Sequence, residues 1–406
     1  MSPSAEMDRA LHALTLTPFF PSDNNEVSGC FIAEPIEQLK QFGIDSSVIA
    51  TAPIYYPRKR PSSSSPAEWV RYPQVPGNFG LSTAGRLLYA RLVGQIRKLH
   101  TVQPIDVIHA HAALPCGHAA RLISIRLHIP FVVTIHGLDV FNSFFQPGTP
   151  ADWRRKVSVD VYRAARTVIC ISGKVQEILQ SGTPPETRST IVYNGVNPGL
   201  FSPIPAELAP SDPEILTVGN LHRGKGHELV LRAVREVKPF FPQLRCRIIG
   251  EGTDRVRLQA LANELGIAPQ VQFAGRQSRS NVAEAMRRCS VFVLPSRNEG
   301  LGCVYLEAMS CAKPVIGCLG QGIEEVIDHG RNGWLIPVDG LEPLVRGLSA
   351  LLGSSELRAS IGMAARQTIL EKFTISHQAQ HLARIYREAI ASSACPSSQM
   401  TRSSAL

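Results

Sequence analysis

The feature that most constrains the fold is an alternation of short β-like runs with longer helical periods, which occurs twice along the chain. Such alternation is typical of βαβ units with parallel strands, because a parallel pair needs a crossover connection, usually a helix. Apolar runs typical of strands covered on both faces occur at Leu11–Thr17, Ser47–Ala50, Val107–Ala110, Phe131–Ile135 and Thr167–Ile171. Helices are expected between them, at Phe31–Phe42, Gly85–His100 and Cys116–Leu127.

A second set follows the segment Asn197–Pro213, whose five prolines indicate an interdomain linker. Its expected strands are Ile215–Val218, Cys246–Ile249, Val271–Phe273, Val291–Leu294, Pro314–Gly317 and Gly333–Ile336. Its expected helices are Glu228–Val237, Asp254–Leu265, Ser280–Arg288 and Leu344–Leu352. The sequence therefore predicts two Rossmann-like, doubly wound parallel-sheet α/β domains in series.

We place the N-terminal domain at residues 1–200 and the C-terminal domain at residues 201–375. A helix is expected at residues 376–391, where it can pack back on the N-terminal domain, and a Ser-rich disordered tail at residues 392–406. Ligands of such sheets bind beyond the carboxyl ends of the strands, so we expect the site in a cleft between the two facing domains.

The formal net charge of the 406-residue chain is +9. Both halves share the basic excess and no nucleic-acid module accompanies it, so nucleic acid is not an expected partner. Polyanionic phosphates or an anionic membrane surface fit better, beside the alternative of a merely basic soluble protein. The loop Arg58–Pro66 (RKRPSSSSP) is expected to be a mobile surface loop, with an acceptor or membrane contact as the alternative.

The nine cysteines include no Cys-x-x-Cys pair, and Cys303, Cys311 and Cys318 lie in apolar segments as expected core residues. Neither a disulfide framework nor a zinc site is expected, which favours a reducing cytoplasm. No secretory signal is visible at the polar N-terminus, and no stretch approaches ~20 apolar residues, so no membrane-spanning helix is expected.

A glycine-rich loop, Gly219–Gly226 (GNLHRGKG), follows one expected strand and precedes a helix. Glycine lets the backbone approach an anion, the helix N-terminus offers free N–H groups, and Lys225 adds a full charge for a diphosphate. The spacing of Gly219, Gly224 and Lys225 also fits a Walker A loop. However, Gly226 replaces the Ser or Thr that would hold Mg²⁺, which argues against a P-loop NTPase. A glycine turn with a solvated lysine is the remaining alternative.

Two glutamates stand eight residues apart in Ser290–Gly317, which is expected to form strand, loop, helix and strand. Glu299 lies in the loop, and a helix that begins near Gly302 carries Glu307 about 8 Å deeper along its axis. One carboxylate can hold sugar hydroxyls and the other a ribose diol, since an ionised carboxylate accepts from two hydroxyls. The alternative is a surface glutamate and a helix-face glutamate in an ion pair.

Three histidines end expected strands of the first domain, where side chains face the ligand crevice. His109 and His111 end one strand, and His136 follows the next in TIHGLD, close to Gly137 and Asp139. We interpret His109 and His111 as hydrogen-bonded structural residues and His136 as a functional one. Their spacing does not match a zinc helix motif.

Together, GNLHRGKG, IIGEGTDR at Ile248–Arg255 and NEGLGCVYLEAMSCAKPVIG resemble the retaining nucleotide-sugar glycosyltransferases of family 4, which have the GT-B fold. TIHGLDVF and VYNGVN at Val192–Asn197 are similar as well, and the resemblance runs from about Leu11 to Ile385. The glutamate pair, followed by Ala-x-x-x-x-x-Pro-Val, is its specific part.

The resemblance assigns the C-terminal domain to the nucleotide sugar and the N-terminal domain to the acceptor. It implies that Glu299 contacts the transferred sugar and that the amides of Gly300, Leu301 and Gly302 help to hold its hydroxyls. Glu307 would hold the ribose.

The resemblance also implies that Lys225 neutralises the diphosphate and that Gly29, in SGCF at the start of the first helix, approaches it with a backbone N–H. His136 would lie near the donor sugar and the acceptor, and with Glu299 and Lys225 it forms the expected catalytic set. Further expected donor-binding residues are Gly219, Asn220, Arg223 and Gly250.

Two positions depart from the family pattern. Many members have Arg where this chain has Asn220, so Lys225, aided by Arg223, must carry more of the phosphate charge. Many have Gly-Gly where this chain has Ser28-Gly29, a mild change if Gly29 makes the contact. The resemblance implies no metal or other cofactor, and no Asp-x-Asp motif is present.

The implied reaction transfers a hexosyl group from a UDP-, GDP- or ADP-linked donor to a cell-envelope polysaccharide or lipid-linked glycan, with retention. It would take place in the cytoplasm, with peripheral contact at the inner face of the membrane. The alternatives are a nucleotide-sugar 2-epimerase on the same fold and a non-catalytic partner subunit.

Overall fold

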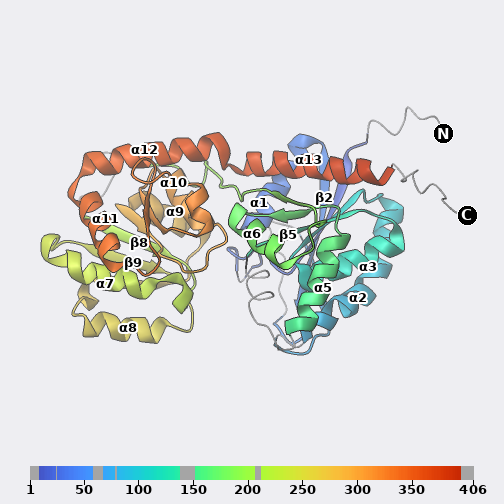
Figure 1. Ribbon diagram of the computed structural model, residues 1–406, viewed down its shortest axis with the longest axis horizontal. Helices are drawn as coiled ribbons and strands as arrows, with labels where there is room; N and C mark the ends of the chain where they lie inside the picture. The colour runs from blue at the N-terminus through green and yellow to red at the C-terminus, as the bar shows by residue number, and fades with distance from the viewer. Residues whose placement is uncertain are drawn as a thin grey trace, which may run out of the picture.

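The computed structural model describes residues 9–23, 25–57, 67–77, 80–137, 151–205 and 212–394. Two α/β domains lie side by side, and helices α12 (Ser355–Lys372) and α13 (Ile375–Ala394) run along one side of both (Figure 1). The loop Arg58–Pro66, Asp139 and most of the expected tail lie outside the described residues.

The N-terminal domain is built on a sheet of seven parallel strands in the order β3-β2-β1-β4-β5-β6-β7. The strands are β1 Leu11–Thr17, β2 Ile44–Pro53, β3 Glu68–Tyr72, β4 Val107–His111, β5 Phe131–Ile135, β6 Val168–Cys170 and β7 Ser189–Ile191. In the central register, Leu14 of β1 lies between Ser47 of β2 and Ile108 of β4. The main helices are α1 Cys30–Leu39, α2 Leu81–Val102, α3 His118–Leu127, α5 Ala151–Ala164 and α6 Gly173–Gly182.

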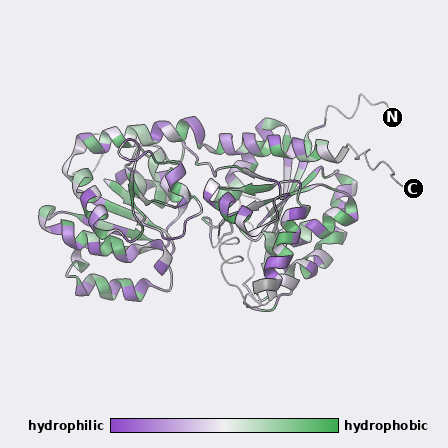
Figure 2. Ribbon diagram, viewed as in Figure 1, coloured by the Kyte–Doolittle hydropathy of each residue, from purple (hydrophilic) through white to green (hydrophobic). Residues whose placement is uncertain are grey.

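The C-terminal domain has six parallel strands in the order β10-β9-β8-β11-β12-β13. They are β8 Glu214–Val218, β9 Arg245–Ile249, β10 Val271–Gly275, β11 Val291–Val293, β12 Val315–Cys318 and β13 Trp334–Ile336. Its main helices are α7 His227–Val237, α8 Arg255–Glu264, α9 Arg279–Arg288, α10 Cys303–Ser310 and α11 Leu341–Gly353, together with α12. In both domains the apolar residues concentrate in the sheets and on the inner sides of the helices (Figure 2).

The predicted fold class, two doubly wound parallel-sheet domains, is confirmed. The sequence pattern misses strands β3 and β7, and each lies at an edge of its sheet. Their short sequences, EWVRY and STI, carry polar side chains and are only partly buried, because an edge strand is covered less than a central one. The sequence pattern also misses helices α5, α6 and α12.

Helix α13 packs on the N-terminal domain, although it follows the C-terminal one in sequence. Leu382, Ala383 and Tyr386 are buried in one cluster with Ala13 and Leu39. The chain therefore crosses between the domains twice, and the two crossings meet where Val196 and Thr374 form a parallel β-bridge. None of the described helices is long and apolar enough to cross a bilayer.

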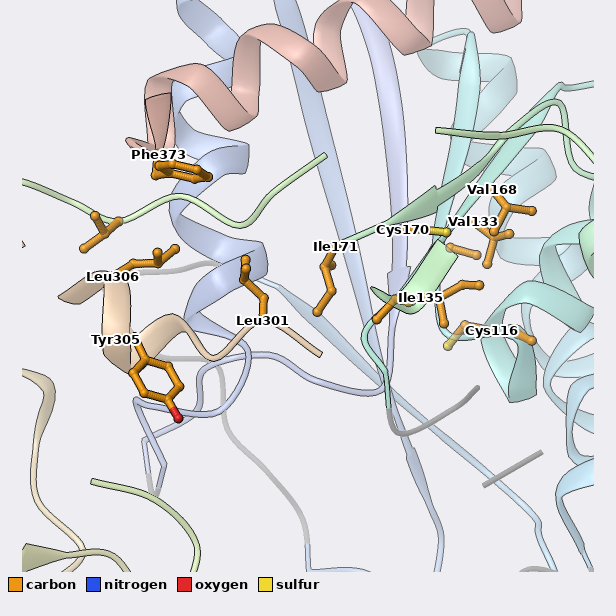
Figure 3. Close-up of a cluster of buried hydrophobic side chains, with 14 of the residues drawn as sticks. Cys116, Val133, Ile135, Val168, Cys170, Ile171, Leu301, Tyr305, Leu306 and Phe373 are labelled. Carbon is orange, nitrogen blue, oxygen red and sulfur yellow. The ribbon is translucent and has the colours of Figure 1, made fainter. Parts of the chain in front are cut away.

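One apolar cluster extends through both domains. Leu301, in the loop after β11, lies close to Ile171, which follows β6 in the other domain (Figure 3). Each of these loops leaves the carboxyl end of its strand, so the two sheets meet through the ends at which nucleotides bind in such folds.

Candidate active site

The glycine-rich loop Gly219–Gly226 leaves β8 and packs against the loop after β9. The Gly219 N–H donates to the Ile249 carbonyl at 3.0 Å. Gly250 has φ 143°, and a Cβ there would lie 1.9 Å from the Gly219 carbonyl oxygen. Only glycine fits such a conformation and such a close approach. Gly250 therefore supports the predicted phosphate loop from beneath.

Lys225 and Glu299 form the central ion pair of the site. The Lys225 Nζ lies 2.5 Å from Glu299 Oε2, and the side chains are 19% and 13% exposed. The Ser296 hydroxyl also donates to Glu299 Oε2, at 3.3 Å. Gly226, with φ 73°, forms the N-cap of α7 directly after Lys225, and a Cβ there would meet the Pro295 carbonyl oxygen at 2.1 Å. The loop is thus tied to the segment that carries Glu299.

The loop Glu299–Gly302 is held by the segment that follows β12. The Glu299 N–H donates to the Gln321 side chain at 2.9 Å, and the Gly322 N–H donates to the Glu299 carbonyl at 3.1 Å. Gly302, with φ 83°, forms the N-cap of α10 without a side-chain cap. The loop therefore ends at a helix N-terminus, where backbone N–H groups and the helix dipole favour an anion.

The same loop touches the N-terminal domain at Gly300. The Ser172 hydroxyl donates to the Gly300 carbonyl at 2.5 Å. A Cβ at Gly300 would lie 3.1 Å from Ile171 Cδ1 and 3.3 Å from the His136 carbonyl. His136 therefore lies beside the glutamate loop, as a shared site between the domains requires.

Glu307, near the middle of α10, is only 4% exposed and pairs with Arg279 of α9, Nη1 to Oε1 at 2.5 Å. The Arg279 Nε also lies 2.6 Å from Glu34 of α1, in the other domain. Its guanidinium carbon sits 4.9 Å from the centre of the Phe201 ring. One arginine thus joins the predicted ribose carboxylate to the N-terminal domain.

Cys303 lies near both of the predicted glutamates, Glu299 and Glu307. Burial, followed by the charge of Glu307 and, with a smaller effect, that of Glu299, raises the pKa of the Cys303 thiol to about 12. Both carboxylates are therefore close to this thiol, which also accepts a hydrogen bond from Asn194 Nδ2 at 3.3 Å. Cys303 is only half-buried, whereas Cys311 and Cys318 are buried as expected.

His136 stands in a row of histidines. Its Nε2 lies 3.0 Å from His111 Nδ1, and the two rings are stacked. His109 lies next to His111 and is hydrogen-bonded to Tyr386 and Thr134, at 2.6 Å in each case. Burial lowers the pKa of His136 to about 3, so this imidazole is neutral at physiological pH. A neutral ring can accept or donate a hydrogen bond but supplies no cation.

Gly29 forms the N-cap of α1 with φ 74°. A Cβ there would lie 2.5 Å from the Phe19 carbonyl carbon, so glycine is required for packing. The Phe19 ring contacts His136 edge-on at 6.3 Å. Burial raises the pKa of the thiol of Cys30, the next residue, and the charges of Arg279 and Glu307 also act on that pKa, so Gly29 lies near the predicted ribose carboxylate.

Two predicted phosphate residues, Asn220 and Arg223, are exposed. Arg223 lines a cavity of about 530 Å³ together with Gly226, the residue after Lys225. Charged side chains of that cavity pair with one another, as Arg257 does with Glu228 and Arg297 with Asp339. The predicted catalytic residues Lys225, Glu299 and His136 are not among the residues that line this cavity.

The structure brings together Lys225, Glu299, Gly300 and His136, and places Glu307 and Gly29 around Arg279. Sequence reasoning missed Arg279, Glu34 and Ser172, because nothing in the local sequence links residues more than a hundred positions apart. Within the described residues, no group of three or more His, Cys, Asp or Glu side chains could hold a metal ion. The eight described cysteines are free thiols.

Fold and site together define a class. Two Rossmann-like domains, joined by a crossing helix, meet through their strand ends around a lysine–glutamate pair and glycine loops, which is the GT-B arrangement. Solved structures share this fold. Sucrose-phosphate synthase from Thermosynechococcus elongatus superimposes with a TM-score of 0.76 at 20% identity, over 94% of this chain and 100% of that one. HepE of Anabaena in complex with UDP-glucose gives 0.73 at 19% identity, over 93% and 100%.

Sequence comparison names the family. Residues 31–200 match the model described as Glycosyltransferase Family 4, and residues 204–368 match the model described as Glycosyl transferases group 1. The D-inositol 3-phosphate glycosyltransferase of Thermobispora bispora is 32% identical over 309 residues, 70% of this chain and 71% of that protein. The chain belongs to glycosyltransferase family 4.

Proposed function

We propose that this glycosyltransferase moves a hexosyl group from a nucleoside diphosphate sugar to a glycan or lipid-linked acceptor of the cell envelope, with retention and without a metal. The ion pair between Lys225 and Glu299 carries the proposal. It joins a cation on the glycine-rich loop to a carboxylate on the loop after β11, and the residue after that carboxylate, Gly300, lies against the backbone of His136 in the opposite domain. A sugar diphosphate bound there would contact both domains at once.

In the proposed reaction, the bond from the anomeric carbon to the diphosphate oxygen breaks and its electron pair stays on the diphosphate. Lys225 is the cation placed to stabilise that developing charge, and the N-terminus of α10 adds backbone donors after Gly302. Preorganised donors of this kind supply the largest share of many rate enhancements. They also offer charge compensation from the chain's own groups, which supports a reaction without a metal.

Retention is proposed through attack on the face that the diphosphate leaves. The acceptor oxygen bonds to the anomeric carbon, and its proton passes to the departing phosphate oxygen. Glu299 is a weak nucleophile in this arrangement, because its Oε2 already accepts from Lys225 and Ser296. This geometry favours hydroxyl binding by Glu299 over a covalent glycosyl intermediate.

The proposed donor for this chain is UDP-linked. HepE supports this choice, because its structure contains UDP-glucose. The relative from Thermobispora bispora is named for a phosphorylated polyol acceptor, which supports a polar, hydroxyl-bearing acceptor here. Glu307 is the carboxylate proposed to hold the donor ribose, after exchanging part of its contact with Arg279 for the ribose diol.

The first test is a thermal-shift screen with UDP, GDP, ADP and their sugars, since a ligand that binds only the folded chain raises its melting temperature. The stabilising donor is then incubated with candidate acceptors, with and without a chelator, and the anomeric configuration of the product is read by NMR. We expect transfer with retention in both conditions. Isomerisation of the donor without an acceptor would instead identify an epimerase, and loss of turnover with the chelator would reject metal independence.

A further inference from the structure

His111 is the last residue of β4, and its ring lies against the ring of His136, which follows the neighbouring strand β5. His111 Nδ1 lies 3.0 Å from His136 Nε2, and the two rings are stacked, with their planes 17° apart and their centroids 5.2 Å from each other. His111 is only 5% exposed. The pair therefore joins the predicted catalytic histidine to the interior of the N-terminal domain.

The backbone and the neighbours of His111 hold its ring in place. His111 pairs with Thr134 in the parallel register of β4 and β5, and the next residue, Ala112, donates its N–H to the Thr134 carbonyl at 2.9 Å. The His109 ring lies against the His111 ring, 4.2 Å away from centroid to centroid. His109 is fixed in turn by its hydrogen bonds to Tyr386 and Thr134. The position of His111 Nδ1 is therefore set before any substrate binds.

Only one proton can lie between the rings of His111 and His136. Burial lowers the pKa of His136 to about 3 and lowers that of His111 well below its ordinary value, so both imidazoles are neutral at physiological pH. A neutral imidazole has one N–H donor and one acceptor nitrogen. The contact is therefore an N–H···N hydrogen bond, and its direction decides which nitrogen of His136 carries a proton.

The other nitrogen of His111 indicates the direction of this bond. His111 Nε2 is buried and has no hydrogen-bond partner among the described residues. A proton at Nε2 would be a buried N–H without an acceptor, which is rarer in proteins than an acceptor without a donor. With the proton at Nδ1, the N–H of His111 donates to His136 Nε2 instead. His136 then carries its own proton at Nδ1.

We infer that His111 is a positioning residue, which donates to His136 Nε2 and fixes the tautomer in which His136 offers Nδ1–H to the substrates. The inference rests on the proposed function, in which His136 lies beside the bound sugar diphosphate. It makes His136 a hydrogen-bond donor to a substrate oxygen. The ring is not the base that takes the acceptor proton, because one nitrogen is protonated and the other already accepts from His111. This agrees with the proposed passage of that proton to the departing phosphate oxygen.

Nitrogen NMR of protein with isotopically labelled histidine reads the tautomer directly, because protonated and unprotonated ring nitrogens resonate far apart. We expect His136, identified by the signals missing in His136→Gln, to be protonated at Nδ1 without any donor present. His111→Phe keeps a ring at this place but removes the hydrogen bond, so His136 should populate both tautomers. A wild-type His136 protonated at Nε2, or the same single tautomer in His111→Phe, would overturn the inference.

Turnover supplies the second measurement. His111→Phe should lower kcat by about 10–100-fold and leave the donor KM within a few-fold of the wild type, since His111 orients a group and does not bind the donor. His111→Asn, whose amide can donate from near the position of Nδ1, should recover part of the rate. The matched control is His12→Phe, at a fully buried histidine of β1 whose Nε2 lies 2.9 Å from Ser47 Oγ.

The control variant His12→Phe also loses a buried hydrogen bond of a histidine, and it should keep both kcat and the tautomer of His136. An equal fall of kcat in His12→Phe and His111→Phe would mean that only stability is lost, which would overturn the inference. A wild type that is inactive with every acceptor would reject the proposed function instead. The tautomer of His136 is measured without turnover, so the two failures are distinguishable.

Discussion

The Arg279 guanidinium of the C-terminal domain lies 2.6 Å from the carboxylate of Glu34 in the N-terminal domain, while its other arm holds Glu307 at 2.5 Å. All three side chains are at most 19% exposed. Glu307 is the carboxylate proposed to hold the donor ribose. Its position therefore depends on Arg279, which also pairs with Glu34 of the opposite domain.

Replacing Arg279 with Met should leave two carboxylates without their cation in a mostly buried setting. We expect the free energy of unfolding to fall by about 3–5 kcal/mol, the cost of breaking a buried pair by removing one partner. Urea unfolding followed by circular dichroism measures the change. Arg288→Met, on the exposed side of the same helix, is the control and should cost less than about 0.5 kcal/mol. Equal losses in both variants would mean that the bridge contributes nothing.

Lys225→Ala should lower kcat by about 10²–10³-fold at saturating donor and acceptor, because it removes the cation proposed to stabilise the departing diphosphate. Lys225→Arg should recover part of the rate, since it keeps the charge. The control is Lys238→Ala, whose amine donates only to the Gly266 carbonyl at the far side of the domain. Turnover of Lys225→Ala within a few-fold of the wild type would remove this residue from the proposed mechanism.

Local sequence patterns predict the two sheets and the groups that lie within one motif. Lys225 and Glu299 each follow a strand of consecutive apolar residues, and the carboxyl ends of neighbouring parallel strands meet at one edge. The pattern could not reveal Arg279, because its partner Glu34 is 245 positions away and neither residue belongs to a recognisable motif. Arg223 is predicted from its place in the glycine loop, and its phosphate contact stays a prediction; the structure shows it exposed and lining a cavity with Gly226.

Gly250→Ala tests the support beneath the phosphate loop. An alanine Cβ would lie 1.9 Å from the Gly219 carbonyl oxygen, and φ 143° is closed to alanine, so one loop must shift. We expect a loss of about 2–3 kcal/mol in unfolding free energy, together with a higher KM for the donor. Gly353→Ala has no atom within 4 Å of the added Cβ and should be close to neutral. A neutral Gly250→Ala would show that the loop is free to move.

The buried His109 should make the protein less stable as the pH falls. Burial lowers its pKa from 6.5 to about 3, so between these values the unfolded chain binds a proton that the folded chain does not. The stabilising contribution is full above pH 6.5 and falls by about 1.4 kcal/mol for each pH unit below it. Unfolding at pH 7.5 and 5 should show a smaller pH dependence in His109→Gln than in the wild type. His128→Gln, at an exposed position, serves as the control. An unchanged slope in His109→Gln would contradict the assignment.

The last prediction concerns Glu325, which follows β12 in the C-terminal domain and caps helix α6 of the other domain. Its carboxylate accepts the N–H groups of Gly173 and Lys174 at 2.7 and 2.8 Å and the Tyr193 hydroxyl at 3.0 Å. Glu325→Ala removes a negative charge from a helix N-terminus together with three hydrogen bonds between the domains. We expect a loss of about 1–2 kcal/mol in unfolding free energy and a higher donor KM, because the closed arrangement loses a contact.

Glu324→Ala is the matched control for this contact. Glu324 precedes Glu325 directly, but its carboxylate accepts only the N–H of Gly320 in its own domain. Small-angle scattering should therefore show a larger radius of gyration for Glu325→Ala than for Glu324→Ala. If the two variants scatter alike and share the donor KM of the wild type, the cap stabilises α6 alone, and the domains are held together by Arg279, Ser172 and the apolar contact of Leu301 with Ile171.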